Sequence, residues 1–302
     1  MNNYKYIIKF INYISNIRQY SIHTIRSYQF DLNEYYTYCI NKYPNKLFLD
    51  LDHKSIQSFI QFLSKKNIKS KTIARKLASI KSFYKYLFIN KLIKVNVSKH
   101  IKSPKINKDL PNYLSIEEIT DLLKIPRGNN RKSLRERLIL ELFYVTGIRI
   151  SELVKVKINN IDLREKTIKI LGKGKKERIV VFGTNLSDSL NAYLDFKEDK
   201  VISNKYLFPA LKKHLSNYNK HISVKTVYNI VKKHLKLISN NEKLSPHSLR
   251  HTFASHLLDN GADLVAIKNL LGHTSLSSTQ IYTHLKPEKL KKIYNKSHPH
   301  AK

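Results

Sequence analysis

The stretch KTIKILGKGKKERIVVF, residues 166–182, contains the only clear β-strand signal in a chain of 302 residues. Two runs rich in β-branched residues, 166–171 and 177–182, flank the glycine-containing segment GKGKK, which predicts an antiparallel hairpin. On both sides of this hairpin the apolar residues recur with the period of a helix. The sequence therefore predicts a mainly α fold with one small antiparallel β-sheet in its second half.

The first hundred residues predict a bundle of four helices. In SIHTIRSYQFDLNEYYTYCI, residues 21–40, the apolar side chains recur about every 3.6 residues, and the following segment NKYPN interrupts the pattern. Basic residues lie between the apolar ones, as expected either of a solvated face or of a bundle that lies against DNA. The other segments with a helical pattern are 6–17, 53–67 and 70–90.

A linker is predicted at residues 105–112, because the segment SPKINKDLPN contains two prolines and lacks apolar periodicity. It divides the chain into a helical domain over residues 1–104 and a larger, α-rich domain over residues 113–302, which holds the predicted hairpin.

The second domain carries several helix signals. Ser115 and Glu118 have the spacing of a capping box, and Ser133 and Glu136 repeat it before an apolar helix that Gly147 is expected to end. Further helical patterns cover residues 224–238, 246–261 and 263–272.

The composition indicates a polyanion as partner. The formal net charge is +34, from 56 basic and 22 acidic residues, and nucleic acid is the simplest match. Part of this excess can reflect a lysine-rich composition on solvated faces. The single cysteine, Cys39, excludes an internal disulfide. Because no apolar run reaches about 18 residues and no signal peptide is evident, we expect a cytoplasmic protein without a membrane anchor.

Arginine is scarce in this chain, with 11 arginines among the 56 basic residues. A position that keeps arginine is therefore expected to need its planar fork, which binds a phosphate through two parallel hydrogen bonds. Arg149, Arg178 and Arg250 lie inside short, distinctive motifs. Three other arginines, at a predicted helix start, are expected to be surface charges: Arg131, Arg135 and Arg137.

Six polar residues form the candidate site: Arg149, Lys173, His247, Arg250, His273 and Tyr282. They provide two guanidinium groups for a phosphate, three proton carriers and one nucleophile, which together could cleave a phosphodiester bond without a metal ion. Each also has an ordinary interpretation when taken alone: a surface pair for His247 and Arg250, a solvated turn residue for Lys173, and a packing residue for Tyr282.

Two other kinds of site are disfavoured. His247, His251 and His256 could share a metal ion by spacing, but no H-E-x-x-H pattern and no nearby carboxylate or cysteine ligands accompany them. We expect His251 and His256 to be packing residues or to support the site. The GKGK segment lacks the G-x-x-x-x-G-K-[ST] pattern of a phosphate loop, which disfavours kinase or ATPase chemistry.

Four motifs resemble, in order and spacing, the conserved boxes of the tyrosine recombinase (phage integrase) family. They are TGIRISEL, GKGKKER, SPHSLRHTFASHLL and LLGHTSLSSTQIYTH, which begin at residues 146, 172, 245 and 270. Residues 1–104 resemble the helical core-binding domain of that family more loosely. The length and the ending SHPHAK most resemble the bacterial Xer recombinases, which resolve chromosome dimers. Ile148, where leucine is more usual, and HPHAK, where HPRA-type endings are common, depart from the pattern without removing a catalytic group.

The resemblance implies how the bond would be cut. Arg149 and Arg250 would clamp the scissile phosphate, and Tyr282 would attack it to give a 3′-phosphotyrosyl link and a free 5′-hydroxyl. The covalent link would retain the energy of the broken bond, so no metal ion, ATP or other cofactor is implied.

The remaining three candidates would move protons or hold the phosphate. By resemblance, Lys173 would protonate the leaving 5′-oxygen, His247 would handle the proton of the nucleophile, and His273 would hydrogen-bond the phosphate. The segment KPEKLKKIYNK, residues 286–296, is a candidate for the last helix that docks into a neighbouring subunit, with a solvated tail as the alternative.

The implied partners are a double-stranded DNA recombination site, further copies of the chain and a paralogous recombinase in a tetramer on two DNA sites, and a DNA translocase. Three alternatives remain open at this point. The chain could be a phage, plasmid or transposon integrase with the same chemistry, a more distantly related type IB topoisomerase, or a basic DNA-binding protein that does not cleave.

Overall fold

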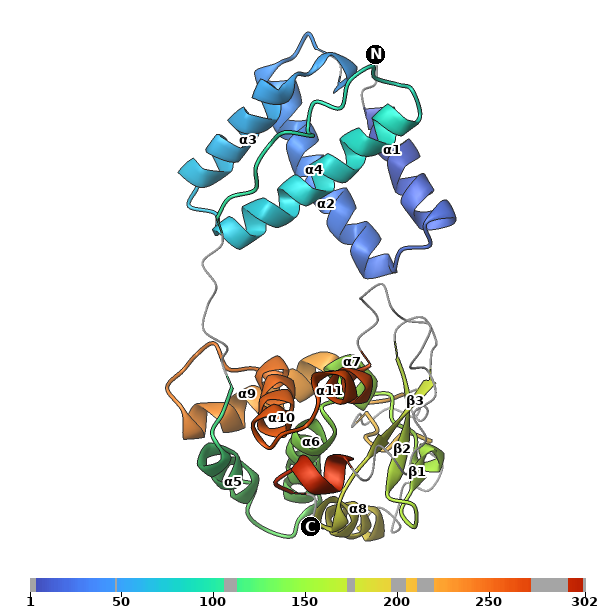
Figure 1. The fold of residues 1–302 in the computed structure, drawn as a ribbon, viewed down its shortest axis with the longest axis vertical. Helices are drawn as coiled ribbons and strands as arrows, with labels where there is room; N and C mark the ends of the chain where they lie inside the picture. Colours follow the sequence, from blue (N-terminus) through green and yellow to red (C-terminus); the bar gives the residue numbers. More distant parts are fainter. Residues whose placement is uncertain are drawn as a thin grey trace. The chain divides into compact units, whose positions relative to one another are not determined.

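The structure is a computed structural model that describes residues 4–46, 48–105, 113–172, 177–196, 205–210, 220–272 and 293–300. The chain divides into two compact units, Met1–Asp109 and Leu110–Lys302 (Figure 1). Each unit encloses a hydrophobic core of its own. The predicted linker lies outside the described residues apart from Lys105.

The first unit is a helical bundle, as its periodicity predicts. The side chain of Ser21 accepts a hydrogen bond from the backbone nitrogen of Thr24 (3.3 Å), and Asp52 caps the next long helix in the same way through Ser55 (3.1 Å). The elements are α1 (Tyr4–Asn12), a π-helical turn (Tyr13–Ile17), α2 (Ile22–Lys42), a 3₁₀ turn (Phe48–Asp50), α3 (His53–Lys65) and α4 (Ser70–Ile89).

Aromatic rings fill the core of the first unit. Tyr35 and Tyr84 are fully buried, and a hydrogen bond between their hydroxyl groups (3.2 Å) satisfies both polar groups. Phe10 meets Phe83 edge-on, with 5.6 Å between ring centroids. Cys39 is buried beside them, and burial raises the pKa of its thiol to about 12, so it is inert at neutral pH.

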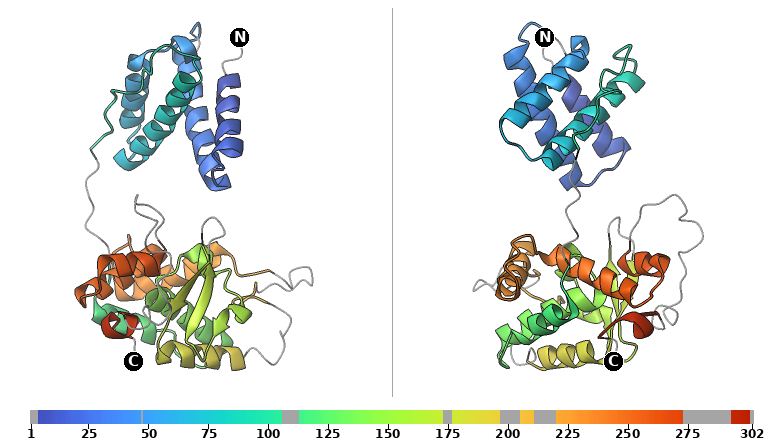
Figure 2. Two further views of the ribbon diagram at one scale, coloured as in Figure 1. Left: turned by 45° about the vertical axis from the view of Figure 1, so that its right-hand side comes forward. Right: turned by 60° about the vertical axis from the view of Figure 1, so that its left-hand side comes forward.

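The second unit is built around α6 (Arg131–Thr146), most of whose side chains are buried. Helices α8 (Thr184–Asp195) and α10 (Pro246–Asp259) pack against it. In Figure 2 the three strands form a single layer beside these helices. The remaining elements are α5 (Ile116–Lys124), α7 (Ile150–Leu153), a 3₁₀ turn (Ile158–Asn160), α9 (Val224–Ile238) and α11 (Leu264–Leu271).

One of the two capping predictions is confirmed and the other is wrong. The Ser115 side chain accepts from the backbone nitrogen of Glu118 (3.2 Å), and the Glu118 carboxylate accepts from the backbone nitrogen of Ser115 (2.8 Å). Helix α6, however, starts at Arg131 rather than after Ser133. Asn130 caps it by accepting from the backbone nitrogen of Ser133 (3.0 Å), because asparagine caps a helix as well as serine does.

The sheet has three antiparallel strands in the order β1 (Ile161–Asp162), β2 (Thr167–Leu171) and β3 (Glu177–Val181). Ile168 pairs with Val180 across the predicted hairpin, and both side chains are buried. The hairpin is therefore confirmed, while its turn at 173–176 lies outside the described residues. The short strand β1 and helix α8 were not predicted.

The end of the described chain packs on the second unit. The buried His298 ring stacks on the buried Tyr294 ring (4.7 Å between centroids), and its Nε2 donates to the main-chain oxygen of Tyr144 (3.3 Å). Asn260 Nδ2 donates to the main-chain oxygen of Ser297 (3.0 Å). The alternative of a solvated tail for residues 286–296 is therefore wrong for the described residues 293–296, which pack on their own unit, while residues 286–292 lie outside the described part. Docking of this segment into a neighbouring subunit stays a prediction.

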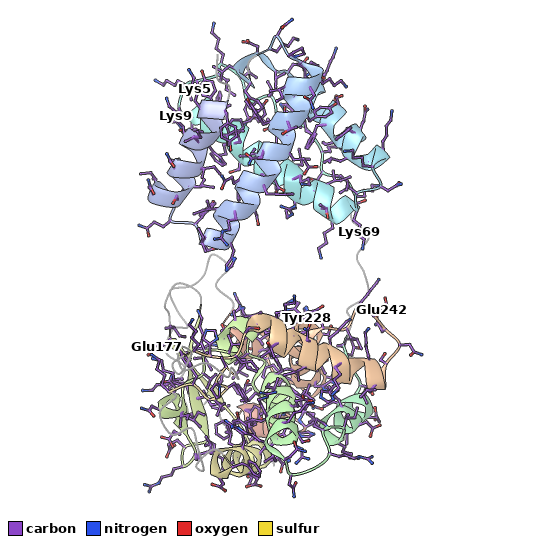
Figure 3. The ribbon with its side chains drawn as sticks, turned by 180° about the vertical axis from the view of Figure 1, so that it is seen from behind. Lys5, Lys9, Lys69, Glu177, Tyr228 and Glu242 are labelled. Carbon is purple, nitrogen blue, oxygen red and sulfur yellow. The ribbon has the colours of Figure 1, made fainter. Side chains whose placement is uncertain are left out.

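Charged side chains lie on the outside of both units, as the exposed Lys5 and Lys69 illustrate for the first and Glu177 and Glu242 for the second (Figure 3). Among the described helices, none combines the length and the apolarity needed to span a membrane.

Candidate functional site

A left-handed turn at the end of α6 places the first candidate residue. Gly147 adopts φ +58°, and a Cβ atom there would come within 2.5 Å of the Phe253 ring. This turn sends Ile148 into the core and leaves Arg149 at the start of α7, with its side chain 37% exposed. Only glycine meets both the conformational and the steric demand at position 147.

Glu152 is the centre of the polar network around Arg149. Its Oε1 accepts from Nη1 of Arg149 (3.0 Å) and Nη1 of Arg178 (2.9 Å). Its Oε2 accepts from the backbone nitrogen of Arg149 (2.8 Å) and Nη2 of Arg178 (2.8 Å). The carboxylate is thus buried with four hydrogen bonds, and one of them restrains the guanidinium group of Arg149.

Arg250 lies on α10 and is buried. Its Nη1 donates to the main-chain oxygen of Gly147, and its Nη2 donates to that of Leu271 (2.6 Å). Arg149 also contacts the C-terminal end of α11, because its Nη2 donates to the main-chain oxygen of Gly272 (3.4 Å). The two predicted phosphate-binding arginines are therefore brought together between the ends of α6 and α11.

Burial and charge oppose each other in this cluster. Burial would raise the pKa of Glu152, but the hydrogen bonds from Arg178 and Arg149 outweigh it and bring the pKa to about 2. Burial lowers the pKa of Arg250, and the charges of Arg149 and Arg178 lower it further, to about 10. Glu152 is consequently an anion and Arg250 a cation at neutral pH, so the cluster keeps a net positive charge that suits a phosphate.

His247 lies one turn before Arg250 on α10, and it is exposed. Pro246 occupies the first turn of that helix, as predicted, and the His247 ring meets His251 edge-on with 4.7 Å between centroids. The other three candidates, Lys173, His273 and Tyr282, lie outside the described residues.

His256 has a structural place. It is buried, its Nε2 donates to the main-chain oxygen of Leu114 (2.9 Å), and its Nδ1 accepts from the hydroxyl of Tyr144 (3.1 Å). Both ring nitrogens are thus used within the fold. In the described ranges, no three histidine, cysteine or acidic side chains gather closely enough to hold a metal ion.

Glu152 was not among the predicted site residues, and Arg178 was predicted to need its planar fork but had no assigned role. The available signal was the spacing of Glu152, three residues after Arg149 within TGIRISEL, which places a carboxylate within reach of that arginine in a helical turn. The contact between Glu152 and Arg178 joins residues far apart in the sequence, so no local pattern could have indicated it.

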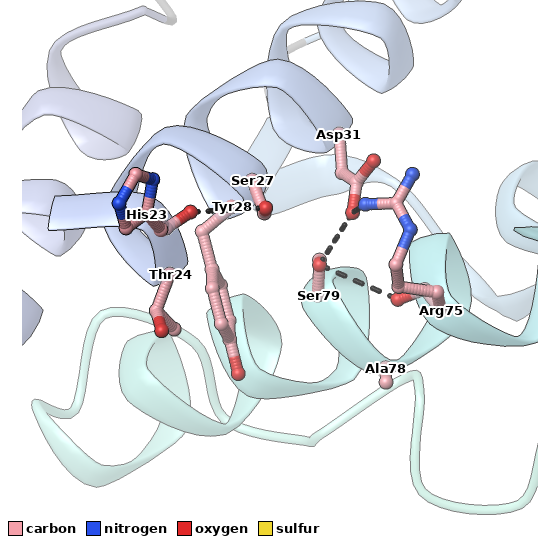
Figure 4. A pocket seen from close by; sticks show the side chains of 8 residues that line it. All are labelled: His23, Thr24, Ser27, Tyr28, Asp31, Arg75, Ala78 and Ser79. Carbon is pink, nitrogen blue, oxygen red and sulfur yellow. Dashed lines mark hydrogen bonds and ion pairs between the residues drawn. The ribbon is translucent and has the colours of Figure 1, made fainter. Parts of the chain in front are cut away.

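A second polar cluster lies between α2 and α4 of the first unit (Figure 4). Asp31 is fully buried, and its carboxylate accepts from Arg75 Nη1 (2.5 Å), Lys76 Nζ (3.2 Å) and Ser79 Oγ (2.8 Å). The Arg75 side chain is 47% exposed and lines a groove of about 340 Å³ together with His23. Asp31 thus holds one guanidinium nitrogen of a side chain that is about half exposed.

Two family models match the chain. The model of the phage integrase family matches residues 112–289, and that of the phage integrase N-terminal SAM-like domain matches residues 7–91. These two matches fall on the second and the first unit respectively.

Curated relatives match along the full length. Tyrosine recombinase XerC of Thermodesulfovibrio yellowstonii is 40% identical over 301 residues, covering 100% of this chain and 98% of that protein. Tyrosine recombinase XerC of Syntrophus aciditrophicus is 37% identical over 303 residues, covering 98% of each.

Among solved structures, XerH site-specific recombinase in a post-cleavage complex with palindromic difH substrate has a similar fold. The TM-score is 0.72 at 23% identity, over 92% of this chain and 81% of that one. Its pre-cleavage complex gives a TM-score of 0.68 at 23% identity, over 94% and 82%.

Proposed function

Because this chain belongs to the phage integrase family, as a site-specific tyrosine recombinase of the Xer type, we propose that Tyr282 cleaves DNA at a phosphate held between Arg149 and Arg250. The observation that carries this proposal is the convergence of the two guanidinium groups on the ends of α6 and α11. Among the described residues, each guanidinium group uses two of its five N–H groups, which leaves donors that suit a phosphate.

The chemistry balances without a cofactor. The Tyr282 oxygen forms a bond to the phosphorus, the bond from phosphorus to the 5′-oxygen breaks, and the product is a 3′-phosphotyrosine. We assign Lys173 to protonating the leaving 5′-oxygen and His247 to accepting the phenol proton. A 5′-hydroxyl of another strand then reverses the step, which rejoins the DNA in a new combination.

The arginines serve the charge that develops during the attack. The pentavalent phosphate carries more negative charge than the diester, and fixed cations stabilise it without reorganisation. Burial helps here, because Arg250 is closed off from water on the side of its two carbonyl partners. We assign a further hydrogen bond to the phosphate to His273, which follows Gly272 in the sequence.

We assign DNA clamping to the first unit, over the predicted range 1–104, with catalysis in 113–302. The half-exposed guanidinium group of Arg75, which Asp31 holds at one nitrogen, suits a phosphate of the DNA backbone. Solved structures with a similar fold include DNA complexes, among them a lambda integrase tetramer bound to a Holliday junction. By analogy, this chain and a paralogue would together form a tetramer on two DNA sites. With a DNA translocase as a further partner, this tetramer would resolve chromosome dimers at cell division in the cytoplasm.

Covalent trapping tests the proposal. On a double-stranded site with a nick beside the scissile phosphate, the cleaved strand diffuses away and the protein remains attached. We expect the wild-type chain to form such an adduct and Tyr282→Phe to bind the same DNA with similar affinity but form none, measured by denaturing gel and by mobility shift.

The result separates the alternatives. A chain that binds DNA but gives no adduct in wild-type form is a non-cleaving DNA-binding protein, and a Tyr282→Phe variant that cleaves normally contradicts the assigned nucleophile. Mapping the attachment point on chromosomal DNA distinguishes a chromosomal resolution site from the end of a mobile element.

A further inference from the structure

Arg178 lies in the candidate site, but none of the six assigned roles belongs to it. We propose that Arg178 is a positioning residue of the cleavage reaction: it pins the Glu152 carboxylate in the place from which that carboxylate orients Arg149 toward the scissile phosphate. The inference rests on the proposed function and adds to it a residue that does not touch the DNA.

The geometry of the pair supports this role. Arg178 donates two parallel hydrogen bonds to Glu152, of 2.9 and 2.8 Å, and its side chain is only 15% exposed. A planar fork on a planar carboxylate fixes both the position and the plane of the acceptor. Both Glu152 oxygens also accept from Arg149, one from its guanidinium group and one from its backbone nitrogen. The place of the carboxylate therefore sets the place of the Arg149 fork.

Arg149 needs such an anchor because its own side chain is partly exposed, at 37%, and it precedes a helix of only four residues as the N-cap. A long side chain in that setting samples many rotamers, and each rotamer away from the reactive geometry slows the reaction. An arginine at position 178 supplies the restraint without occupying the phosphate position, since both of its Nη atoms are used by Glu152.

Arg178 also joins the elements that carry other candidate residues. It lies on β3, opposite Ile170 of β2, in the hairpin whose turn contains Lys173 in the sequence. Its Cδ and Nε would lie 2.9 and 3.1 Å from a Cβ atom at Gly272, the residue before His273. Its Nε is buried and has no hydrogen-bond partner among the described residues. One side chain thus contacts the start of α7, the hairpin and the end of α11.

The charges around Glu152 give the inference a distinctive signature. In the described part of the chain, the charged groups that face Glu152 are Arg149, Arg178 and Arg250. Burial raises the pKa of Glu152, and the hydrogen bond from Arg178 is the largest influence that lowers it. Without Arg178, burial persists while the main compensation is lost, so Glu152 would take up a proton at a higher pH than in the wild type. A protonated Glu152 loses its charge-assisted bond to Arg149.

The test compares cleavage rates over a range of pH. The rate of adduct formation on the nicked site is measured at saturating protein from pH 5.5 to 8.5 for the wild type, Arg178→Gln and Arg178→Lys. Dividing each variant's rate by the wild-type rate cancels the protonation of groups that the proteins share. We expect Arg178→Gln to be slower by roughly 10- to 100-fold at pH 7.5, with the ratio falling further toward pH 5.5.

The lysine variant is the conservative comparison. It keeps a positive charge beside Glu152 but lacks the fork, so its rate is reduced by a factor that stays constant with pH. DNA affinity remains within about twofold for both variants, because Arg178 does not contact DNA in this scheme. In a Glu152→Gln background, Arg178→Gln adds no further pH dependence.

The control is Arg164→Gln, an exposed arginine in the loop between β1 and β2, which should cleave at the wild-type rate. If the thermal transition shows that Arg178→Gln is unfolded, the lysine variant tests the inference instead. Its cleavage rate should then be lower than that of the wild type by a factor that does not change with pH. The inference is overturned if Arg178→Gln cleaves at the wild-type rate, or if the ratio of its rate to the wild-type rate does not change with pH. Either result leaves the role of Tyr282 intact. If the wild-type chain forms no adduct, both proposals fail together.

Discussion

At the scale of single residues, two carboxyl groups of the second unit show how the supply of hydrogen-bond donors decides whether burial raises the pKa. Burial would raise the pKa of Glu152, yet two arginines bring it to about 2. Burial raises the pKa of Glu141 to about 7, and weaker influences from Ser189 and Arg137 do not compensate. One Glu141 oxygen, Oε2, is buried without a hydrogen-bond partner among the described residues.

Glu141 should therefore make stability depend on pH. Its folded pKa of about 7 exceeds the ordinary value of 4.5, so the folded state holds the proton more tightly than the unfolded state. Stability then falls as pH rises from about 4.5 to 7, and the full cost applies above that range. We expect Glu141→Gln to unfold with a free energy about 1 to 3 kcal/mol higher than wild type at pH 8 and nearly equal to it at pH 4.5.

Urea unfolding at the two pH values measures this difference. Glu242→Gln, at an exposed glutamate, is the matched control and should change stability by less than about 0.5 kcal/mol at either pH. An equal effect of Glu141→Gln at pH 4.5 and pH 8 would show that the carboxylate is not strained in the folded state.

Gly147 allows the cost of its conformation to be separated from the cost of its packing. Alanine at Gly147 must adopt φ +58° and place its Cβ 2.5 Å from the Phe253 ring. Alanine at Gly261 must adopt φ +80° but meets no atom within 4 Å. We expect about 1 kcal/mol of destabilisation at Gly261 and about 3 kcal/mol or more at Gly147, measured by urea unfolding. Equal losses would contradict the tight packing of the turn that carries Arg149.

The residue types predicted which side chains matter, but not how they are held. Arg149 and Arg250 could be singled out because arginine is rare in this lysine-rich chain and both lie in distinctive motifs. Arg250 donates to the main-chain oxygens of Gly147 and Leu271, which lie 103 and 21 positions away in the sequence. No pattern of side chains predicts such contacts. Lys173, His273 and Tyr282 stay predictions, because they lie outside the described residues.

At the scale of elements, prediction succeeded where periodicity and caps agreed. Helix α9 has the predicted bounds, Val224–Ile238, because Ser223 caps its start and the apolar period is regular. Helix α8 was missed because TNLSDSLNAYLD contains several asparagine, serine and aspartate residues, which favour turns in isolation. Its helical state comes from packing against α6, which buries Leu186 and Leu190.

The docked C-terminal segment should contribute measurably to the stability of the second unit. Tyr294 is 1% exposed and stacks on His298, so Tyr294→Ala removes a large buried ring. We expect a loss of about 3 kcal/mol or more in the free energy of unfolding, as for other buried aromatic residues. Tyr228→Ala on α9 is the control, since that ring is 42% exposed, and it should cost under about 1 kcal/mol. Similar losses for both would indicate that the segment leaves the unit in solution.

At the scale of the whole molecule, the net charge of +34 makes phosphate contacts the dominant expectation for binding. In the ranges that the structure describes, most of the basic side chains are exposed lysines, which bind a polyanion without fixed geometry. Arg75 differs from them because a fully buried carboxylate, Asp31, holds it at the rim of a groove. We therefore expect Arg75 to bind one particular phosphate, whereas the exposed lysines attract the DNA without fixed contacts.

Arg75→Ala should therefore weaken DNA binding in a characteristic way. Loss of one phosphate contact lowers the affinity similarly on all DNA sequences and reduces the slope of log K against log salt by about 1. Fluorescence titrations between about 50 and 200 mM salt measure both quantities. Arg18→Ala is the matched control, because Arg18 lies in the same unit and bonds Tyr13 instead (2.9 Å). An unchanged slope for Arg75→Ala would exclude it as a phosphate contact.

The two carbonyl partners of Arg250 also bear on how an inert form of this protein should be made. An alanine at position 250 would deprive the main-chain oxygens of the buried residues Gly147 and Leu271 of the donors that Arg250 supplies among the described residues, which typically costs 1 to 3 kcal/mol for each group. An Arg250 variant would lose catalysis and loosen the ends of two helices at once, so its inactivity would be ambiguous. Tyr282→Phe removes one oxygen atom. It is the better starting point for a reagent that occupies recombination sites without altering them.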